Sequence, residues 1–166
     1  MQRSRLTASR RDFLKAAGLA VTSAGIVPAW MADLTYGQEQ AAASARRKIG
    51  SIGVGGQGTG IMLNASGLAD VVAVADVDKN HLNRAKEELG KRQKDIDVEL
   101  FGDYRKLLDR KDIVAVTIGS PDHWHSRMVI DAMKAGKDVY CEKPLTLTVA
   151  EGQQILKVMK DTGKVL

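Results

Sequence analysis

A glycine-rich segment near residue 53 contains the first residues that could do chemistry. Gly53, Gly55 and Gly58 have the spacing G-x-G-x-x-G, at the end of the apolar run Ile49 to Val54 and at the start of a helical stretch. Where a strand leads into a helix, free backbone N–H groups and the helix dipole favour an anionic ligand such as a pyrophosphate. A side chain at these glycines would restrict the turn or the approach of the phosphate. We therefore expect a phosphate-binding loop made of Gly53, Gly55, Gly56, Gln57 and Gly58.

Asp76 is the acidic residue that would complete a dinucleotide site. It follows the next apolar run, Val71 to Ala75. A carboxylate at this place can accept hydrogen bonds from both hydroxyls of an adenosine ribose. It would repel a ribose 2′-phosphate, and the next residues, Val77 and Asp78, provide no arginine to neutralise one. The pattern favours NAD over NADP, and the alternative is a structural turn with a solvent-facing aspartate.

Polar residues also follow two later apolar runs. Residues 120–125 read SPDHWH after the run Ile113 to Ile118, and Glu142, Lys143 and Pro144 follow the run 138–141. The carboxyl ends of parallel strands meet at the crevice where such sheets bind ligands, so both stretches can reach a nicotinamide. An ammonium group there can polarise or protonate a developing alkoxide. Lys143 is therefore the candidate catalytic residue, and the alternative is a surface lysine paired with Glu142.

The histidines and the cysteine have simpler interpretations. His123 and His125 lack a third ligand at metal spacing, so we expect no metal site and assign them to positioning cofactor or substrate. His81 begins a polar helical stretch, and we interpret it as an exposed residue without a role. Cys141, the single cysteine, lies in an apolar run and is interpreted as a buried, unreactive thiol.

Alternating strand and helix patterns must position these residues. The runs VVAVA (71–75) and IVAVTIG (113–119) are continuously apolar, as in strands that helices cover on both faces. The alternation predicts an α/β fold with a doubly wound, mainly parallel sheet, the Rossmann fold. Expected strands are 49–54, 71–75, 98–101, 113–118 and 138–141, with a further strand beginning at 164. Expected helices run from the glycine turn to about residue 67, over 79–91, 104–108 and 126–135, and after Pro144.

Two stretches resemble the Gfo/Idh/MocA oxidoreductases, the glucose-fructose oxidoreductase and inositol dehydrogenase family. They are SPDHWH at 120–125 and AGKDVYCEKPLT at 135–146, and the resemblance covers nearly all of residues 47–166. It implies that the loop glycines contact the pyrophosphate of NAD and that Asp76 contacts the adenosine ribose. It also implies a second α/β domain, which binds the substrate and is absent from this chain. The residues that it places near the nicotinamide are Pro121, His125, Glu142, Lys143 and Pro144.

The composition argues against a nucleic-acid partner. The 166 residues include 25 basic and 20 acidic ones, a net charge of +5, and only 4% are aromatic. The excess charge is diffuse, and basic residues mostly alternate with acids, as on solvated helix faces. So few aromatic residues provide no set of stacking platforms for single strands.

Residues 1–45 are typical of an export signal with a linker. Residues 9–15, SRRDFLK, include Arg10 and Arg11 and resemble the twin-arginine signal of bacterial export, and an almost uncharged run from Ala16 to Ala32 follows. That run is only marginally long for a membrane span of about 20 residues, so we expect no stable membrane anchor. The sequence predicts a periplasmic or otherwise exported protein with a dinucleotide-binding domain at 46–166, a fragment of a longer protein.

Three functions are compatible with these patterns. In the favoured one, the full-length protein transfers a hydride between a secondary alcohol of a sugar or polyol and NAD. In the second, a glycoside-cleaving enzyme oxidises and re-reduces its sugar on a retained NAD. The third is a non-catalytic nucleotide-binding remnant, because the sheet is open at its last strand. A homo-oligomer is compatible with a full-length protein, and the sequence does not identify the sugar.

Overall fold

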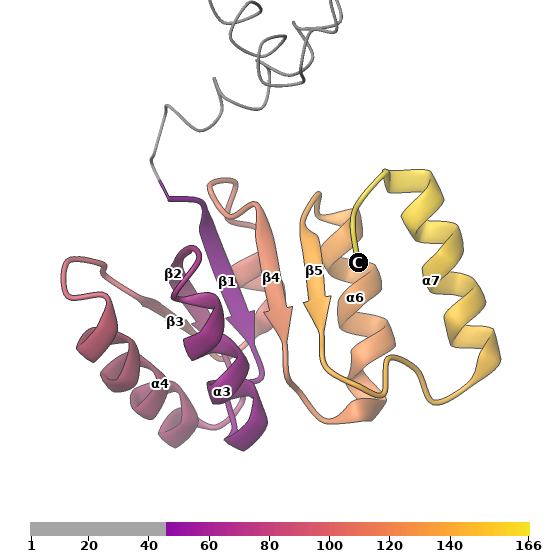
Figure 1. Ribbon diagram of the computed structural model, residues 1–166. Coiled ribbons are helices and arrows are strands. Elements are labelled where there is room, and N and C mark those ends of the chain that lie inside the picture. The colour runs from indigo at the N-terminus through magenta and orange to yellow at the C-terminus, as the bar shows by residue number, and fades with distance from the viewer. Residues whose placement is uncertain (1–45) are drawn as a thin grey trace, which may run out of the picture. The chain divides into compact units, whose positions relative to one another are not determined.

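The computed structural model describes residues 46–166, and the predicted export signal lies outside the described residues. At its centre is a five-stranded sheet with the order β3-β2-β1-β4-β5, in which all neighbouring strands are parallel. This confirms the doubly wound parallel fold (Figure 1). The strands are β1 (Lys48–Ile52), β2 (Asp70–Ala75), β3 (Glu99–Phe101), β4 (Ala115–Ile118) and β5 (Asp138–Cys141). The helices are α3 (Gly56–Ala65), α4 (Lys79–Arg92), α5 (Tyr104–Leu108), the 3₁₀ turn η1 (Asp122–Trp124), α6 (His125–Lys134) and α7 (Val149–Thr162).

Two hydrophobic clusters cover the two faces of the sheet. On one face, Met62 of α3 and Leu82 and Leu89 of α4 pack on β1 and β2. On the other face, residues of α5, α6 and α7, among them Leu107 and Met133, pack on β1, β2, β4 and β5. Figure 1 shows α3 and α4 in front of the strands. Because both faces are covered, the strands carry continuous apolar runs, as the sequence indicated.

Local sequence signals set the helix starts. The side chain of Asp78 accepts from Asn80 N at α4, and that of Asp103 accepts from Arg105 N at α5. Thr148 and Glu151 form a reciprocal capping box at α7. Each pairing satisfies an N–H group that the first helical turn leaves without a partner. No helix within residues 46–166 has both the length and the apolar character that a membrane span needs.

The order in which successive strands are added to the sheet reverses between β1 and β4, and three glycines lie in contact at this point. Gly53 has a positive φ of 73°, which ends β1 two residues earlier than the apolar run predicted. A Cβ atom on Gly58 would overlap with Gly53 O, and one on Gly119 would lie 2.5 Å from the Cα atom of Gly58. The loop after β1, the first turn of α3 and the loop after β4 therefore touch backbone to backbone. We call Gly53, Gly58 and Gly119 the glycine contact.

Gly58→Ala tests the glycine contact. The new methyl group has no space against Gly53, so the free energy of unfolding should fall by about 1–3 kcal/mol, as in overpacked cores. Urea unfolding monitored by circular dichroism measures the change.

Gly60→Ala is the matched control, because Gly60 lies in the same helix and its Cβ would meet nothing within 4 Å. This variant should be more stable by roughly 0.5–1 kcal/mol, since alanine is the better helix former. Equal free energies of unfolding for the two variants would show that the close backbone packing at Gly58 does not contribute to stability.

Candidate functional site

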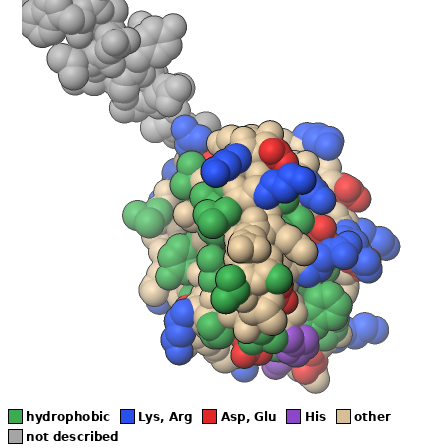
Figure 2. Space-filling view, turned by 90° about the vertical axis from the view of Figure 1, so that its right-hand side faces the viewer, with side chains coloured by type: hydrophobic (Ala, Val, Ile, Leu, Met, Phe, Trp, Pro, Cys, Tyr) green, Lys and Arg blue, Asp and Glu red, His purple; other side chains and the backbone are tan. Residues whose placement is uncertain are grey.

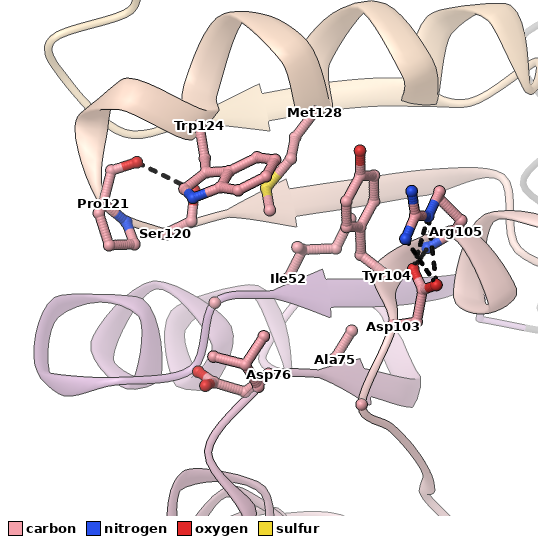
Figure 3. Close-up of a pocket in the computed structure, with 13 residues that line it drawn as sticks. Ile52, Ala75, Asp76, Asp103, Tyr104, Arg105, Ser120, Pro121, Trp124 and Met128 are labelled. Carbon is pink, nitrogen blue, oxygen red and sulfur yellow. Dashed lines mark hydrogen bonds and ion pairs between the residues drawn. The ribbon is translucent and has the colours of Figure 1, made fainter.

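A cleft of about 390 Å³ opens at the carboxyl ends of β1, β2, β3 and β4. This is the edge at which a doubly wound sheet binds ligands, next to the point where the strand order reverses. Figure 3 shows Asp76 on one wall and Trp124 with Met128 on the other. The cleft is lined by Ile52, Gly53, Ala75, Asp76, Val77, Gly102, Asp103, Tyr104, Arg105, Ser120, Pro121, Trp124 and Met128.

The first turn of α3 has the free donors that a phosphate needs. Its N-cap residue, Gly55, provides no side-chain cap, and no acidic residue lies in the first turn. The hydroxyl of Thr59 donates to Val54 O at 2.7 Å and to Gly55 O at 2.6 Å, which fixes the loop. A Cβ on Gly56 would meet nothing within 4 Å, so the outer side of the turn is open. The loop fits a diphosphate held by backbone N–H groups.

Asp76 is held rigidly at the end of β2. Its Oδ2 accepts from Val54 N at 2.9 Å and its Oδ1 accepts from Asp78 N at 2.9 Å. The side chain is only 10% exposed. A carboxylate oxygen has two lone pairs, so each oxygen can still accept a ribose hydroxyl. Asp76 thus joins the glycine loop to the loop after β2 and presents a fixed pair of acceptors.

His81 lies beside Asp76, a placement that sequence reasoning missed. Its Nδ1 is 3.4 Å from Asp76 Oδ2 and its Nε2 is 3.8 Å from Asp78 Oδ2. A Cβ on Gly55 would lie 3.5 Å from the imidazole ring. The side chain is 38% exposed, so it forms an outer wall between the glycine loop and α4. The available signal was its position in the first turn of the helix that follows Asp76.

His125 joins two loops from inside the protein. The residue is 1% exposed, and its Nδ1 lies 2.7 Å from Pro144 O and its Nε2 lies 2.8 Å from Ser120 O. A carbonyl oxygen only accepts and a neutral imidazole has one N–H group, so the neutral ring donates to one of the two carbonyl groups in each tautomer and lies against the other. The ring thereby ties the loop after β4 to the loop that carries Lys143. Direct contact of His125 with a cofactor stays a prediction, and the geometry favours a positioning role.

Lys143 and Glu142 lie in the loop after β5. Glu142 N donates to Ile118 O at 2.9 Å, which holds the start of this loop against the end of β4. Both residues line a second hollow, which runs along β5 and also includes Tyr140 and Leu145. Lys143 is exposed, and among the described residues no ion pair joins it to Glu142. Its ammonium is therefore available to a ligand.

The other lysine of the same stretch, Lys137, is at the opposite end of β5. It is 3% exposed and donates to Arg110 O at 2.6 Å and to Ile113 O at 2.8 Å. Burial lowers the pKa of this ammonium group. Lys137 stabilises the start of the strand and cannot reach the cleft, so Lys143 is the candidate for chemistry.

Cys141 and the histidines provide no further reactive group. Burial, with a smaller contribution from Glu142, raises the pKa of the Cys141 thiol to about 12, which suits an unreactive side chain. Within residues 46–166, no three His, Cys, Asp or Glu side chains gather as a metal site would require. His123 is largely exposed beside Asp122 at the start of η1.

Residues 47–166 match the family model described as "Oxidoreductase family, NAD-binding Rossmann fold", the Gfo/Idh/MocA model. The chain belongs to the Gfo/Idh/MocA oxidoreductase family. Scyllo-inositol dehydrogenase of Lactobacillus casei, solved with bound NAD(H) and scyllo-inositol, is 30% identical with a TM-score of 0.64 over 72% of this chain. A probable dehydrogenase of Thermotoga maritima is 33% identical, also with a TM-score of 0.64 over 72% of this chain. The family model and the dehydrogenase solved with NAD(H) support NAD as the cofactor of this Gfo/Idh/MocA domain.

The names of curated relatives of this Gfo/Idh/MocA domain describe glycoside cleavage and not dehydrogenation. An alpha-N-acetylgalactosaminidase of Shewanella oneidensis is 35% identical, and a glycosyl hydrolase family 109 protein of Shewanella baltica is 33% identical, each over 93% of this chain. The chain spans 38% of the length of these relatives. It spans 34% of the length of the two solved dehydrogenases.

Asp76→Ala tests the ribose site. Loss of the fixed carboxylate removes two charge-assisted hydrogen bonds, so the affinity for NAD should fall by roughly 10–100-fold. The affinity for NADP should fall less, because the repulsion of the 2′-phosphate disappears too. Calorimetric titration of both nucleotides measures the two effects.

Asp95→Ala is the control, since Asp95 is an exposed carboxylate that precedes β3 at the opposite edge of the sheet and does not line the cleft. It should bind NAD like the unsubstituted chain. Undiminished NAD binding by Asp76→Ala would contradict the assignment of Asp76.

Proposed function

We propose that the full-length protein is an exported NAD-dependent oxidoreductase that acts on a secondary alcohol of a sugar or polyol. The observation that carries the proposal is that three candidate binding features lie along one edge of the sheet. The open first turn of α3 and the fixed carboxylate of Asp76 lie at one sheet edge, and His125 ties the exposed Lys143 loop to the same edge. A dinucleotide bound over the first two features would extend toward the third.

The reaction removes a hydride from the alcohol carbon and a proton from its hydroxyl, which gives a ketone. NAD, when bound, supplies the hydride acceptor. The glycine loop and Asp76 hold the diphosphate and the adenosine ribose. The ammonium group of Lys143 stabilises the alkoxide as it develops, or donates a proton to it in the reverse direction. The base that takes the hydroxyl proton belongs to the remaining part of the protein.

The cleft supports a preference for NAD over NADP. Asp76 is locked by Val54 N and Asp78 N and cannot rotate away from a 2′-phosphate. Arg105, the one lysine or arginine among the residues that line the cleft, is held by both carboxylate oxygens of Asp103. It is therefore already engaged and provides little compensation for a second phosphate.

A second function is favoured by the curated relatives. Two of them bear the names of glycoside-cleaving proteins and match this chain at 33% and 35% identity. In such a reaction the sugar would be oxidised and then reduced again on the same NAD, so that no NADH accumulates. The glycine loop, Asp76 and Lys143 would have the same tasks, and only net redox turnover separates the two functions.

A missing domain is supported by the surface of the described part. The chain spans 38% of the length of its curated relatives. Apolar side chains are exposed on β5, in the loop before α7 and on α7, including Tyr140 at 60%, Leu147 at 54%, Val149 at 80% and Leu156 at 58%. Figure 2 shows hydrophobic side chains gathered on this side of the molecule. Further chain that covers this surface would bury area that water otherwise contacts.

Lys143→Ala in the full-length protein tests the oxidoreductase proposal. With a panel of sugars and polyols, we expect NADH formation by the unsubstituted protein and at least about a hundredfold loss of kcat in the variant. NAD affinity should change little. Lys157→Ala, an exposed lysine on α7, is the control and should retain its activity.

The outcomes separate the three functions. Sugar-dependent NADH formation supports the oxidoreductase. Release of sugar from a glycoside without NADH supports the glycoside-cleaving enzyme. NAD binding with neither activity leaves the nucleotide-binding remnant, and full activity of Lys143→Ala removes the catalytic role of this lysine.

The twin-arginine signal is tested by Arg10→Lys combined with Arg11→Lys. Because a receptor reads the two arginines, the double substitution should abolish export of the chain, although it leaves the charge of the signal unchanged. Cell fractionation with antibody detection measures the distribution between cytoplasm and periplasm. Arg3→Lys combined with Arg5→Lys, a matched pair outside residues 9–15 that also keeps the charge, should be exported normally. Export of the double variant at the normal level would contradict the proposal.

A further inference from the structure

We propose that Trp124 is the platform on which the adenine ring of the dinucleotide stacks, so that this side chain selects a purine base. The inference rests on the proposed NAD-dependent function and adds a specificity-determining residue to its site. Neither the sequence patterns nor the relatives assign a role to Trp124.

Trp124 is a large apolar side chain left open to the cleft. It is the last residue of η1, where its backbone N–H donates to Pro121 O at 3.0 Å. The residue is 45% exposed. Tryptophan is usually largely buried, so an indole with almost half its surface in contact with water has apolar surface available for a ligand. Because this surface lines a concave site, a flat apolar ligand can cover it.

The neighbours of Trp124 leave room for stacking. Figure 3 shows the indole beside Met128, one helical turn further along, so that both side chains form one wall. The imidazole of His123 has its ring centroid 6.2 Å away with a tilt of 46°, which is not a stacked arrangement. Trp124 ends η1 and Met128 belongs to the following helix α6, so the indole shares its wall with α6 and is not covered by a parallel ring of His123.

The opposite wall fixes where the base must lie. Asp76 would hold the adenosine ribose, and the base is bonded to that ribose. The wall next to Asp76 consists of Val77, which is 92% exposed, and of Gly102, whose added Cβ would meet nothing within 4 Å. A base attached to a ribose at Asp76 therefore lies in the space between this wall and Trp124.

The charges around that space favour a neutral ring. Arg105 and Asp103, which line the far end of the cleft, are paired with each other at 2.9 Å. Met128, on the Trp124 side, is uncharged. Stacking of a base on an aromatic side chain stabilises binding without any charge on the base. Adenine satisfies these conditions, and its large ring system covers more of the indole than a pyrimidine would.

Fluorescence of the 166-residue chain tests the proposal. The chain has two tryptophans, Trp30 and Trp124, so Trp30→Phe leaves Trp124 as the only emitter. ADP-ribose is the probe, because it contains the adenine, the ribose and the diphosphate but no nicotinamide. We expect ADP-ribose to quench the emission of Trp124 in a saturable manner. Nicotinamide mononucleotide, which lacks adenine, should not quench it.

Affinities measured by calorimetry complete the test. Trp124→Ala should bind ADP-ribose about tenfold more weakly or worse, and Trp124→Phe should recover most of the affinity. Leu68→Ala is the control, because Leu68 is an exposed apolar side chain that precedes β2, at the sheet edge opposite the cleft, and this variant should bind normally. Circular dichroism establishes that each variant is folded.

The failures can be told apart. If Trp124→Ala binds ADP-ribose like the unsubstituted chain, or if saturating ADP-ribose leaves the emission unchanged, Trp124 is not the adenine platform while NAD binding stands. If neither NAD nor ADP-ribose binds the unsubstituted chain, the cofactor function fails and the proposal fails with it.

Discussion

The glycine contact is the constraint on which the rest of the structure depends. At Gly53, Gly58 and Gly119, three backbone segments approach so closely that a single added Cβ atom would overlap or lie within 2.5 Å of the next segment. This approach lets α3 begin at Gly56, four residues after the end of β1, and Gly53 of the connecting loop lines the cleft. The close packing that keeps the sheet and the helix together is therefore also what creates the anion site.

Two hydrogen-bonded side chains extend this geometry along the sheet edge. Asp76 accepts from Val54 N and Asp78 N and so fixes the loops after β1 and β2 relative to each other. The ring of His125 connects Ser120 O with Pro144 O and fixes the loops after β4 and β5. Because the glycine contact joins the loops after β1 and β4, these four loops form one connected edge. A ligand that spans the edge meets a surface that is already organised, which reduces the entropy cost of binding.

The sequence predicted the elements better than it predicted the contacts. Periodicity located α5 and β5 at both ends, and capping residues such as Asp78 and Asp103 explain why the helix starts were clear. The end of β1 was predicted two residues late, because an apolar run does not reveal the positive φ of Gly53. The roles of His125 and Lys137 depend on carbonyl groups 19 to 27 residues away, those of Pro144, Arg110 and Ile113, so no local pattern indicates them.

The most direct test of the account is a titration of the chain with NAD, followed by NMR of its backbone amides. If α3 provides the phosphate site and Asp76 provides the ribose site, the largest shifts should occur at Gly55, Gly56 and Gln57 and at the residues that follow Asp76. Amides at the amino ends of the strands, such as that of Lys137, should not move. Shifts centred away from the glycine loop, or none at saturating NAD, would contradict the account.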